Sequence, residues 1–183
     1  MAERRARDLE LLDRLGAHPG IAFSGDVWRV VRKGRDVAQP GNGGGRWAPD
    51  GLDVLHTALA RDGALAEIHF HLARQPVFPS KLELVLYRWK VATAQTLQLI
   101  DLAAVAALGI SAQDYGGLVY ARTQEIADAA AFLGFDGILA PSARWPCQNL
   151  TLFADRLAPG ALETVASEPV DWKAWRKSLG PKR

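Results

Sequence analysis

The chain has 183 residues, 49% of them hydrophobic and 23% charged, which is the composition of a soluble globular protein that buries a core within one domain. Lys and Arg number 22 against 20 Asp and Glu, a balance that argues against a protein built to bind nucleic acid or an anionic membrane. The single cysteine, Cys147, excludes an intrachain disulfide. The charged N-terminal segment does not resemble a secretion signal, and the longest uncharged, mostly apolar segment, 102–112, is shorter than the ~20 residues that cross a bilayer. We therefore expect a cytoplasmic protein.

Hydrophobic periodicity and chain breakers predict helices and strands in a mixed order. Leu9, Leu12 and Leu15 share one helical stripe, which ends at Gly16. In chain order, the pattern predicts a helix over 3–15, strands over 26–32 and 54–57, a helix over 58–72, a strand over 82–89, a helix over 122–133, strands over 136–140 and 149–153, and a last helix within 170–183. Because helices and strands do not alternate steadily, the sequence favours an α+β fold over a doubly wound sheet.

The segment 41–51, GNGGGRWAPDG, gathers glycines around one arginine and one tryptophan. Glycine lets the backbone approach a ligand closely, so the segment is either a flexible surface loop or a place where a ligand docks. It is not a P-loop, because Arg46 and Trp47 follow Gly45, and it does not match the dinucleotide fingerprint. The Arg46 guanidinium has paired donors that suit phosphate or carboxylate oxygens, although a surface salt bridge would use the same donors.

Two other polar residues stand out from the apolar pattern around them. Glu67 lies at the edge of an apolar helix face, where its carboxylate is either half-buried and perturbed or an ordinary solvated group. Ser142 follows a predicted strand, as a turn serine or as a ligand contact, and lacks the flanking glycines of a hydrolase nucleophile. Glu67, His69 and His71 have no further candidate ligands to complete a zinc site, so we expect no metal.

Four motifs in order resemble the RES domain family, which is named for a recurrent Arg, Glu and Ser. They are GGGRWAPDG, VLHTA, ALAEIHFHL and GILAPSAR followed by CQNLTLF, within residues 28–153. The resemblance places the family's three residues on Arg46, Glu67 and Ser142. Arg29, in VWRVV, resembles an arginine of the family's opening strand. The chain departs from the family at His56, where a tyrosine is usual, so the role of that ring is open here.

The resemblance implies a single domain similar to ADP-ribosyltransferase toxins, with central split β-sheets and flanking helices, that uses NAD as a co-substrate. It implies catalytic roles for Glu67, Arg46 and His56, and NAD contacts from Arg29, Gly45, Arg46, Trp47 and Ser142. The Glu67 carboxylate would stabilise the positive charge that grows on the ribose as nicotinamide leaves. The resemblance also divides the chain into an N-terminal helical extension (1–20), a RES domain (21–160), and a C-terminal helix with a basic tail packed on the same domain (161–183).

RES proteins are toxins of type II toxin-antitoxin systems, so the resemblance implies a cognate antitoxin, which we expect to carry a helix-turn-helix DNA-binding domain. Among the possible acceptors of ADP-ribose we favour a protein target. The alternative is an NAD glycohydrolase or phosphorylase that depletes cellular NAD. Two rival interpretations are a non-catalytic nucleotide-binding module and a nucleic-acid-binding protein that uses Trp47, Trp145 and the basic tail; the near-neutral charge argues against the second.

Overall fold

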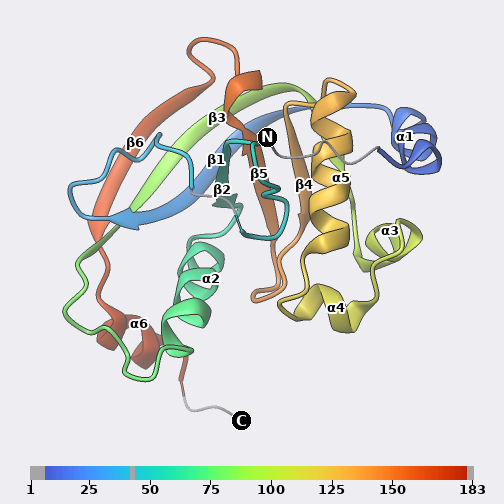
Figure 1. Cartoon of the computed structure of the whole chain (residues 1–183). Coiled ribbons are helices and arrows are strands. Elements are labelled where there is room, and N and C mark those ends of the chain that lie inside the picture. The colour runs from blue at the N-terminus through green and yellow to red at the C-terminus, as the bar shows by residue number, and fades with distance from the viewer. Residues whose placement is uncertain (1–6, 42–43, 181–183) are drawn as a thin grey trace.

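The computed structural model describes residues 7–41 and 44–180, and Figure 1 shows a mixed arrangement of helices and strands. The helices are α1 (Leu9–Gly16), α2 (Arg61–Ala73), α3 (Leu102–Ala107), α4 (Ala112–Gly116), α5 (Ala121–Phe132) and α6 (Trp172–Ser178), with a 3-10 turn η1 (Ala154–Arg156). The strands are β1 (Ile21–Arg32), β2 (Val54–Ala58), β3 (Leu84–Gln98), β4 (Gly137–Pro141), β5 (Gln148–Phe153) and β6 (Leu162–Pro169). The predicted α+β class is confirmed. Within the described residues, no helix has the length and apolar character needed to cross a membrane.

The strands form one sheet in the order β1-β2-β5-β4-β3-β6, and β3 also pairs with β1, so the first five strands close on themselves like a barrel. Strand β3 is 15 residues long, which lets it pair with β1 along most of its length, with β6 over its first half and with β4 at its end. The β4–β5 pair is close-packed at Gly137, where a Cβ atom would lie 2.6 Å from the Thr151 carbonyl oxygen. The closure therefore brings β1, β2 and β5 together beside one helix, α2.

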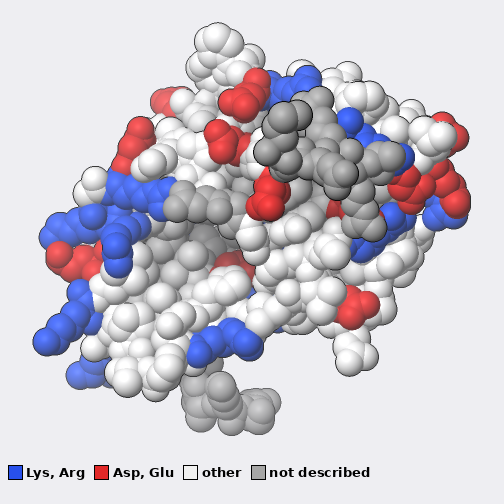
Figure 2. Space-filling model, viewed as in Figure 1, with Lys and Arg blue, Asp and Glu red and all other residues white. Residues whose placement is uncertain are grey.

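Apolar side chains pack in three clusters around this sheet. The cluster inside the closure draws on each of the strands β1 to β5 and consists of Val27, Leu55, Trp89, Val91, Leu139, Leu150 and Leu152. In Figure 1, α1, α3, α4 and α5 lie on one side of the strands, while α2 and α6 lie on the other. On the face drawn in Figure 2, charged side chains of both signs are spread over the surface, and the positive ones are denser where the loop after β1 lies.

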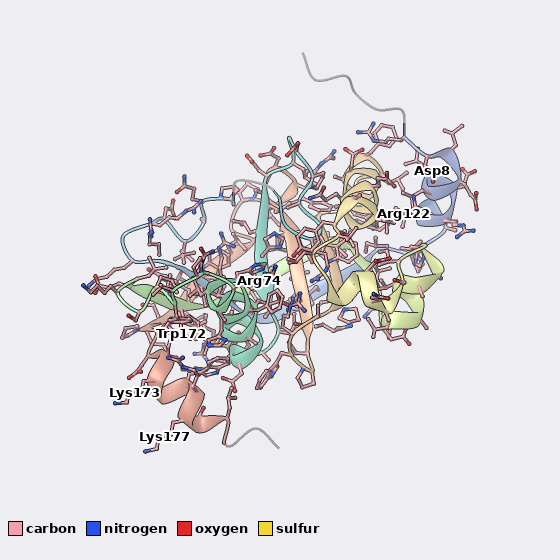
Figure 3. All side chains as sticks on the ribbon, turned by 60° about the horizontal axis from the view of Figure 1, so that its bottom comes forward. Asp8, Arg74, Arg122, Trp172, Lys173 and Lys177 are labelled. Atoms are coloured by element: carbon pink, nitrogen blue, oxygen red, sulfur yellow. The ribbon has the colours of Figure 1, made fainter. Side chains whose placement is uncertain are left out.

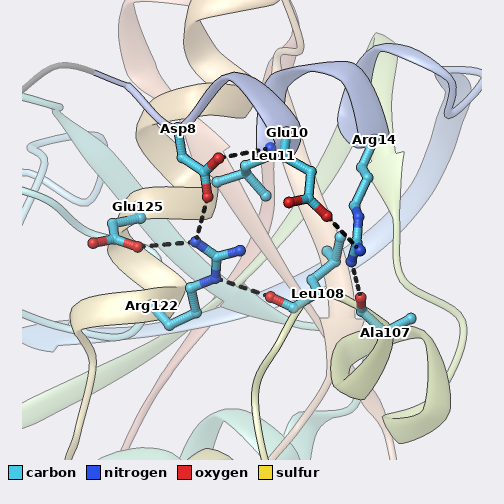
Figure 4. A network of polar contacts seen from close by, with 8 residues as sticks. All are labelled: Asp8, Glu10, Leu11, Arg14, Ala107, Leu108, Arg122 and Glu125. Atoms are coloured by element: carbon cyan, nitrogen blue, oxygen red, sulfur yellow. Dashed lines mark hydrogen bonds and ion pairs between the residues drawn. The ribbon is translucent and has the colours of Figure 1, made fainter.

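Helix α1 is held against α3 and α5 by charged side chains. We call this contact the α1 seam; it consists of Asp8, Glu10, Leu11, Arg14, Ala107, Leu108, Arg122 and Glu125 (Figure 4). The Arg122 guanidinium donates to the Asp8 carboxylate at 3.3 Å, to the Glu125 carboxylate at 3.1 Å and to the Leu108 carbonyl at 2.9 Å. The backbone N–H of Leu11, and then Arg122, lower the pKa of Asp8 below its usual value. The seam packs α1 onto the same body as the sheet.

Several predicted elements have different bounds in the structure. The helix expected over 3–15 is α1, which begins at Leu9, and residues 1–6 lie outside the described residues. The strand expected over 82–89 runs to Gln98 as part of β3. It continues because the later residues pair with β1 as far as Thr96 and with β4 from Thr96 to Gln98.

Other elements were missed. Strand β6 lies where only a helix and a tail were predicted; nearly all its residues are exposed, so it lacks the alternating apolar pattern of a half-buried strand. Helices α3 and α4 are short, and their sequence signals are the N-cap residues Asp101 and Ser111. Helix α2 begins at Arg61 rather than at Ala58, because Ala58 ends β2.

Candidate active site

A cavity of about 230 Å³ lies between α2, residues of β1, β2 and β5, and the loop that carries Arg46. We call it the central cavity, and its lining residues are Trp28, Arg29, Val30, Gly45, Arg46, Trp47, His56, Thr57, Ala58, Ala64, Glu67, Ile68, His71, Tyr115, Tyr120, Arg144, Asn149 and Thr151. Glu67 is the only carboxylate among these lining residues, against three arginines. The cavity therefore carries a surplus of positive charge, which suits an anionic ligand.

Glu67 is held at one wall of the cavity by two hydrogen bonds to the same oxygen. Its Oε1 atom accepts from the Ser142 hydroxyl at 2.8 Å and from Asn149 Nδ2 at 2.9 Å. The backbone N–H groups of Arg144 and Trp145 donate to Ser142 Oγ at 3.1 and 3.3 Å, which directs the hydroxyl hydrogen toward Glu67. The structure thus brings together the predicted Glu67 and Ser142, which are 75 residues apart in the chain.

Arg46 is part of the cavity lining, and its guanidinium forms no ion pair with a carboxylate in the described part of the chain. Its Nη2 atom donates to the Tyr115 carbonyl at 2.5 Å, and its guanidinium carbon is 4.6 and 5.4 Å from the ring centroids of Tyr115 and Tyr120. Its Nε atom is buried and has no hydrogen-bond partner among the described residues. A buried donor without a partner is costly unless a ligand supplies the acceptor, so the geometry supports an anion-binding role for Arg46.

Arg29 lines the cavity but uses its guanidinium as a clamp on the backbone. Its Nε, Nη1 and Nη2 atoms donate at 3.0 Å to the carbonyls of Val37, His56 and Gln39, respectively. Burial, together with the positive charge of Arg35, lowers the pKa of Arg29 to about 10. Arg29 thereby joins β1 to β2 and to the loop that follows β1. The NAD contact predicted for Arg29 stays a prediction.

His56 faces the cavity from β2, opposite Thr151 on β5. Its Nδ1 atom lies 3.3 Å from Thr151 Oγ1. The His56 side chain is exposed, but it lies within the cavity, whose walls surround it with protein atoms. This enclosure, and then the charges of Arg29 and Arg46, lower the pKa of His56 to about 4. These causes favour the neutral form of the His56 imidazole at pH 7.

The loop around Arg46 is packed rather than loose in its described part. A Cβ atom on Gly45 would lie 3.1 Å from His56 Nε2, and Gln124 Nε2 donates to the Gly45 carbonyl at 3.1 Å. Trp47 is buried and adopts a φ of 66°, the only left-handed non-glycine conformation among the described residues. Asn42 and Gly43 of the glycine-rich segment lie outside the described residues. The buried Trp47 anchors the loop, and that anchoring fixes the position of Arg46.

Sequence reasoning missed several lining residues. Asn149 contacts Glu67, and its Oδ1 atom is buried without a hydrogen-bond partner among the described residues. Arg144, two positions after Ser142, donates to the carbonyls of Gly116 and Gly117 at 2.6 and 3.3 Å. Its position beside Ser142 was the available signal. Tyr115 and Tyr120 lie in a segment for which no element was predicted, and nothing in their spacing pointed to this cavity.

The group Glu67, His69 and His71 does not converge on one point. Glu67 and His71 line the cavity, one helical turn apart on α2. His69 lies on a different face of the helix, where its ring centroid is 5.5 Å from that of Trp172 and 5.3 Å from that of Trp175. Among the described residues, no group of three or more His, Cys, Asp or Glu side chains is arranged to hold a metal ion.

Comparison with protein families gives a match over most of the chain. The RES domain family matches residues 26–173, a range that contains every residue of the central cavity. The chain belongs to the RES domain family. Since the matched range includes Arg46, Glu67 and Ser142, the resemblance of the motifs is confirmed at the level of the family.

Relatives of this RES protein are found among characterised proteins and solved structures. The chain is 28% identical over 166 residues to proteins of Mycobacterium bovis and Mycobacterium tuberculosis that are named NAD(+) phosphorylase MbcT, covering 86% of this chain and 89% of theirs. Its structure matches a chain in the crystal structure of the M. tuberculosis MbcT-MbcA toxin-antitoxin complex with a TM-score of 0.84 and 23% identity, covering 94% of this chain and 98% of that one. At that identity, the structural match establishes the shared fold.

Proposed function

We propose that this RES protein is the toxin of a toxin-antitoxin pair that cleaves NAD between nicotinamide and ribose and passes the ADP-ribosyl group to inorganic phosphate. The observation that carries the proposal is the Glu67 carboxylate, fixed by Ser142 and Asn149 in a cavity lined by three arginines. The cavity fits a dinucleotide in chemical terms. It offers a buried, unpartnered donor on Arg46, a buried, unpartnered acceptor on Asn149, and a glycine, Gly45, in its lining.

The chemistry of the bond explains why one carboxylate suffices. Nicotinamide leaves a pyridinium as a neutral ring, so its departure needs no proton, while positive charge grows on the ribose. A fixed carboxylate stabilises that charge more in the transition state than in the ground state. Ser142 and Asn149 both bond to Glu67 Oε1, which holds the carboxylate in one orientation before the substrate arrives. Glu67 is thus assigned the electrostatic role.

The comparisons favour a small-molecule acceptor over the protein target expected from the sequence. The relatives that share 28% identity with this chain are named NAD(+) phosphorylases, which corresponds to the alternative reading of NAD consumption. Water and phosphate also differ in what they demand of the site. Water must lose a proton as it attacks, whereas hydrogen phosphate attacks through an oxygen that is already unprotonated. Burial lowers the pKa of His56 to about 4, which makes this imidazole a weak base for water, so the name of the relatives remains the main support for phosphate.

The decisive experiment follows all products of NAD. The purified full chain is incubated with NAD labelled in the adenosine, with and without inorganic phosphate and cell lysate, and the products are separated by chromatography. We expect nicotinamide and ADP-ribose 1-phosphate in equal amounts, at a rate that rises with phosphate. Label in ADP-ribose at a phosphate-independent rate would show a glycohydrolase, and label in a lysate protein would restore the protein-transfer reading. No release of nicotinamide would leave a nucleotide-binding module.

A cognate antitoxin belongs to the same proposal, since the matched MbcT chain was solved as a toxin-antitoxin complex. The antitoxin's helix-turn-helix domain and the cytoplasmic location stay predictions, as does the division of the chain at residues 20 and 160. Co-expression of this chain with the protein encoded by the neighbouring gene, followed by affinity purification, tests the partnership. A stable complex that no longer releases nicotinamide from NAD is expected. Separate elution of the two proteins, with activity unchanged, would contradict it.

A further inference from the structure

We propose that Arg144, together with Arg46, forms the site that holds inorganic phosphate as the acceptor. This inference rests on the proposed function and adds a binding site that neither the family residues nor the predicted NAD contacts include. Arg46 is shared with the predicted NAD contacts, so Arg144 is the residue that makes the phosphate site distinct. Both guanidinium groups line the central cavity.

The two arginines converge on one short segment, the end of α4. Arg46 Nη2 donates to the Tyr115 carbonyl at 2.5 Å, and Arg144 Nη1 and Nη2 donate to the carbonyls of Gly116 and Gly117 at 2.6 and 3.3 Å. Each arginine also has a buried Nε atom with no hydrogen-bond partner among the described residues. Carbonyl acceptors orient a guanidinium but do not cancel its charge. The two cations are therefore held side by side with donors to spare, which is an arrangement suited to an oxyanion with several acceptor oxygens.

The surroundings of Arg144 keep its charge in place. Its guanidinium carbon lies 3.5 Å from the centroid of the Phe70 ring, so the aromatic face supports the cation from one side. Burial, and then the positive charge of Arg46, lower the pKa of Arg144, although it stays protonated at neutral pH. Two like charges in one partly buried place are unfavourable in the empty cavity, and a bound dianion relieves that repulsion.

Arg144 is also tied to the reaction centre through its own backbone. Its N–H donates to Ser142 Oγ, and the Ser142 hydroxyl donates to Glu67 Oε1. The segment that fixes Glu67 thus carries the proposed phosphate-binding side chain two residues later. An anion held by Arg144 lies near the carbon whose positive charge Glu67 stabilises, which is the placement an acceptor needs.

The step balances without a further reactant. The bond from ribose C1 to the nicotinamide nitrogen breaks, and its electron pair leaves with the neutral nicotinamide. An unprotonated oxygen of hydrogen phosphate supplies the pair for the new C1–O bond, and the phosphate keeps its own proton. The arginines hold the phosphate and offset its negative charge beside the Glu67 carboxylate. They take no proton in this step.

The test compares two arginines that share one aromatic ring. Arg74, at the end of α2 in Figure 3, lies with its guanidinium carbon 5.6 Å from the Phe70 centroid but does not line the cavity. We expect Arg144→Gln to raise the KM for phosphate roughly tenfold or more, because it removes a charged hydrogen-bond donor to the anion. The KM for NAD should change far less, and the product should shift from ADP-ribose 1-phosphate toward ADP-ribose. Arg74→Gln should leave both KM values and the product ratio unchanged.

A binding measurement separates this inference from the proposed function. Inorganic phosphate alone, without NAD, should raise the thermal unfolding temperature of the wild type and of Arg74→Gln but not that of Arg144→Gln. Equal increases in the KM for NAD and for phosphate in Arg144→Gln would overturn the inference, because Arg144 would then bind the diphosphate of NAD. Phosphate stabilisation that persists in Arg144→Gln would also overturn it. One outcome separates the two proposals: the wild type binds phosphate but releases no nicotinamide, and Arg144→Gln does not bind phosphate. That outcome would support the anion site and contradict the proposed reaction.

Discussion

The α1 seam and the central cavity use arginine in two different ways. In the seam, Arg14 and Arg122 each pair with a carboxylate, at 2.7 Å to Glu10 and at 3.3 Å to Asp8. In the cavity, the hydrogen bonds that the guanidinium groups of Arg29, Arg46 and Arg144 donate to other described residues all go to backbone carbonyls. The seam thus neutralises its charges within the protein, whereas the cavity orients its guanidinium groups and keeps their charges available.

The kind of partner, carboxylate or carbonyl, therefore distinguishes a structural arginine from a ligand-binding one, even where no ligand is bound. A carbonyl fixes the direction of a guanidinium but leaves most of its charge, so a cavity built in this way attracts anions. A carboxylate partner removes that attraction and leaves a modest contribution to stability. The single cavity carboxylate, Glu67, follows the same logic, because it bonds to Ser142 and Asn149 rather than to an arginine. Its negative charge therefore also remains available, for the ribose.

The largest expected effect tests that free negative charge. Glu67→Gln keeps the shape and can still bond to Ser142 and Asn149, but removes the charge that opposes the ribose cation. We expect the rate of nicotinamide release to fall on the order of 10²-fold or more, with NAD binding largely preserved. Steady-state kinetics and NAD titration measure the two quantities. Nicotinamide release at near wild-type speed would remove Glu67 from the mechanism.

The next effect compares one substitution in the two regions. Arg46→Lys replaces a forked donor by a point ammonium, so we expect NAD affinity to fall roughly tenfold. Arg122→Lys in the seam is the matched control, and it should leave NAD affinity unchanged. Titration of both variants with NAD under the same salt concentration gives the comparison. An unchanged affinity in Arg46→Lys would show that its charge serves the fold alone, as in the seam.

A smaller effect concerns acid stability and the neutral state of His56. Its pKa is about 4 in the folded protein against an ordinary value of ~6.5 in the unfolded chain. Below pH 6.5 the unfolded chain binds a proton at His56 that the folded protein does not bind. The contribution of the neutral His56 to the free energy of unfolding is therefore fully present above pH 6.5 and is lost as pH falls toward 4. His56→Gln should therefore flatten the decline of the unfolding temperature over that range.

The control for His56 is His71, which also lines the cavity. Burial lowers the pKa of His71 as well, but the charge of Glu67 raises it in opposition, so His71→Gln should change the acid profile less. Thermal unfolding monitored between pH 7 and pH 4 gives all three curves. Parallel curves for the wild type and His56→Gln would contradict the assignment of a neutral, enclosed imidazole.

Parts of the site could be predicted from the sequence and others could not. Motif resemblance found Glu67 and Ser142, although no spacing rule relates positions that meet only because the fold places α2 beside the segment that follows β4. The clamp made by Arg29 was beyond reach, because its partners are backbone carbonyls and any residue at positions 37 and 39 would supply them. Tyr115 was missed for a similar reason, since it reaches the cavity from a short helix without a strong pattern.

The elements of the fold also separate into those that the sequence pattern predicted and those that it missed. Strands β1, β2, β4 and β5 carry buried apolar residues, and the sequence pattern found each of them, with β1 beginning five residues earlier than expected. Strand β6 is an exposed edge strand, so its pairing with β3 depends on backbone hydrogen bonds that leave little trace in side-chain hydropathy. Sequence patterns report the burial of side chains, so they do not reveal elements that are held mainly by backbone hydrogen bonds.

The smallest expected effect tests the seam itself. Arg122→Gln removes the charge that pairs with Asp8 before α1 and with Glu125 on α5, while leaving the length for a hydrogen bond to the Leu108 carbonyl. Since its side chain is partly exposed, we expect a loss of roughly 1 kcal/mol in the free energy of unfolding. Because α1 lies away from the central cavity, the KM values for NAD and phosphate should not change. Chemical denaturation and steady-state kinetics on the same preparation give both numbers. A changed KM with intact stability would mean that the seam communicates with the cavity, and the separation between structural and ligand-binding arginines would fail.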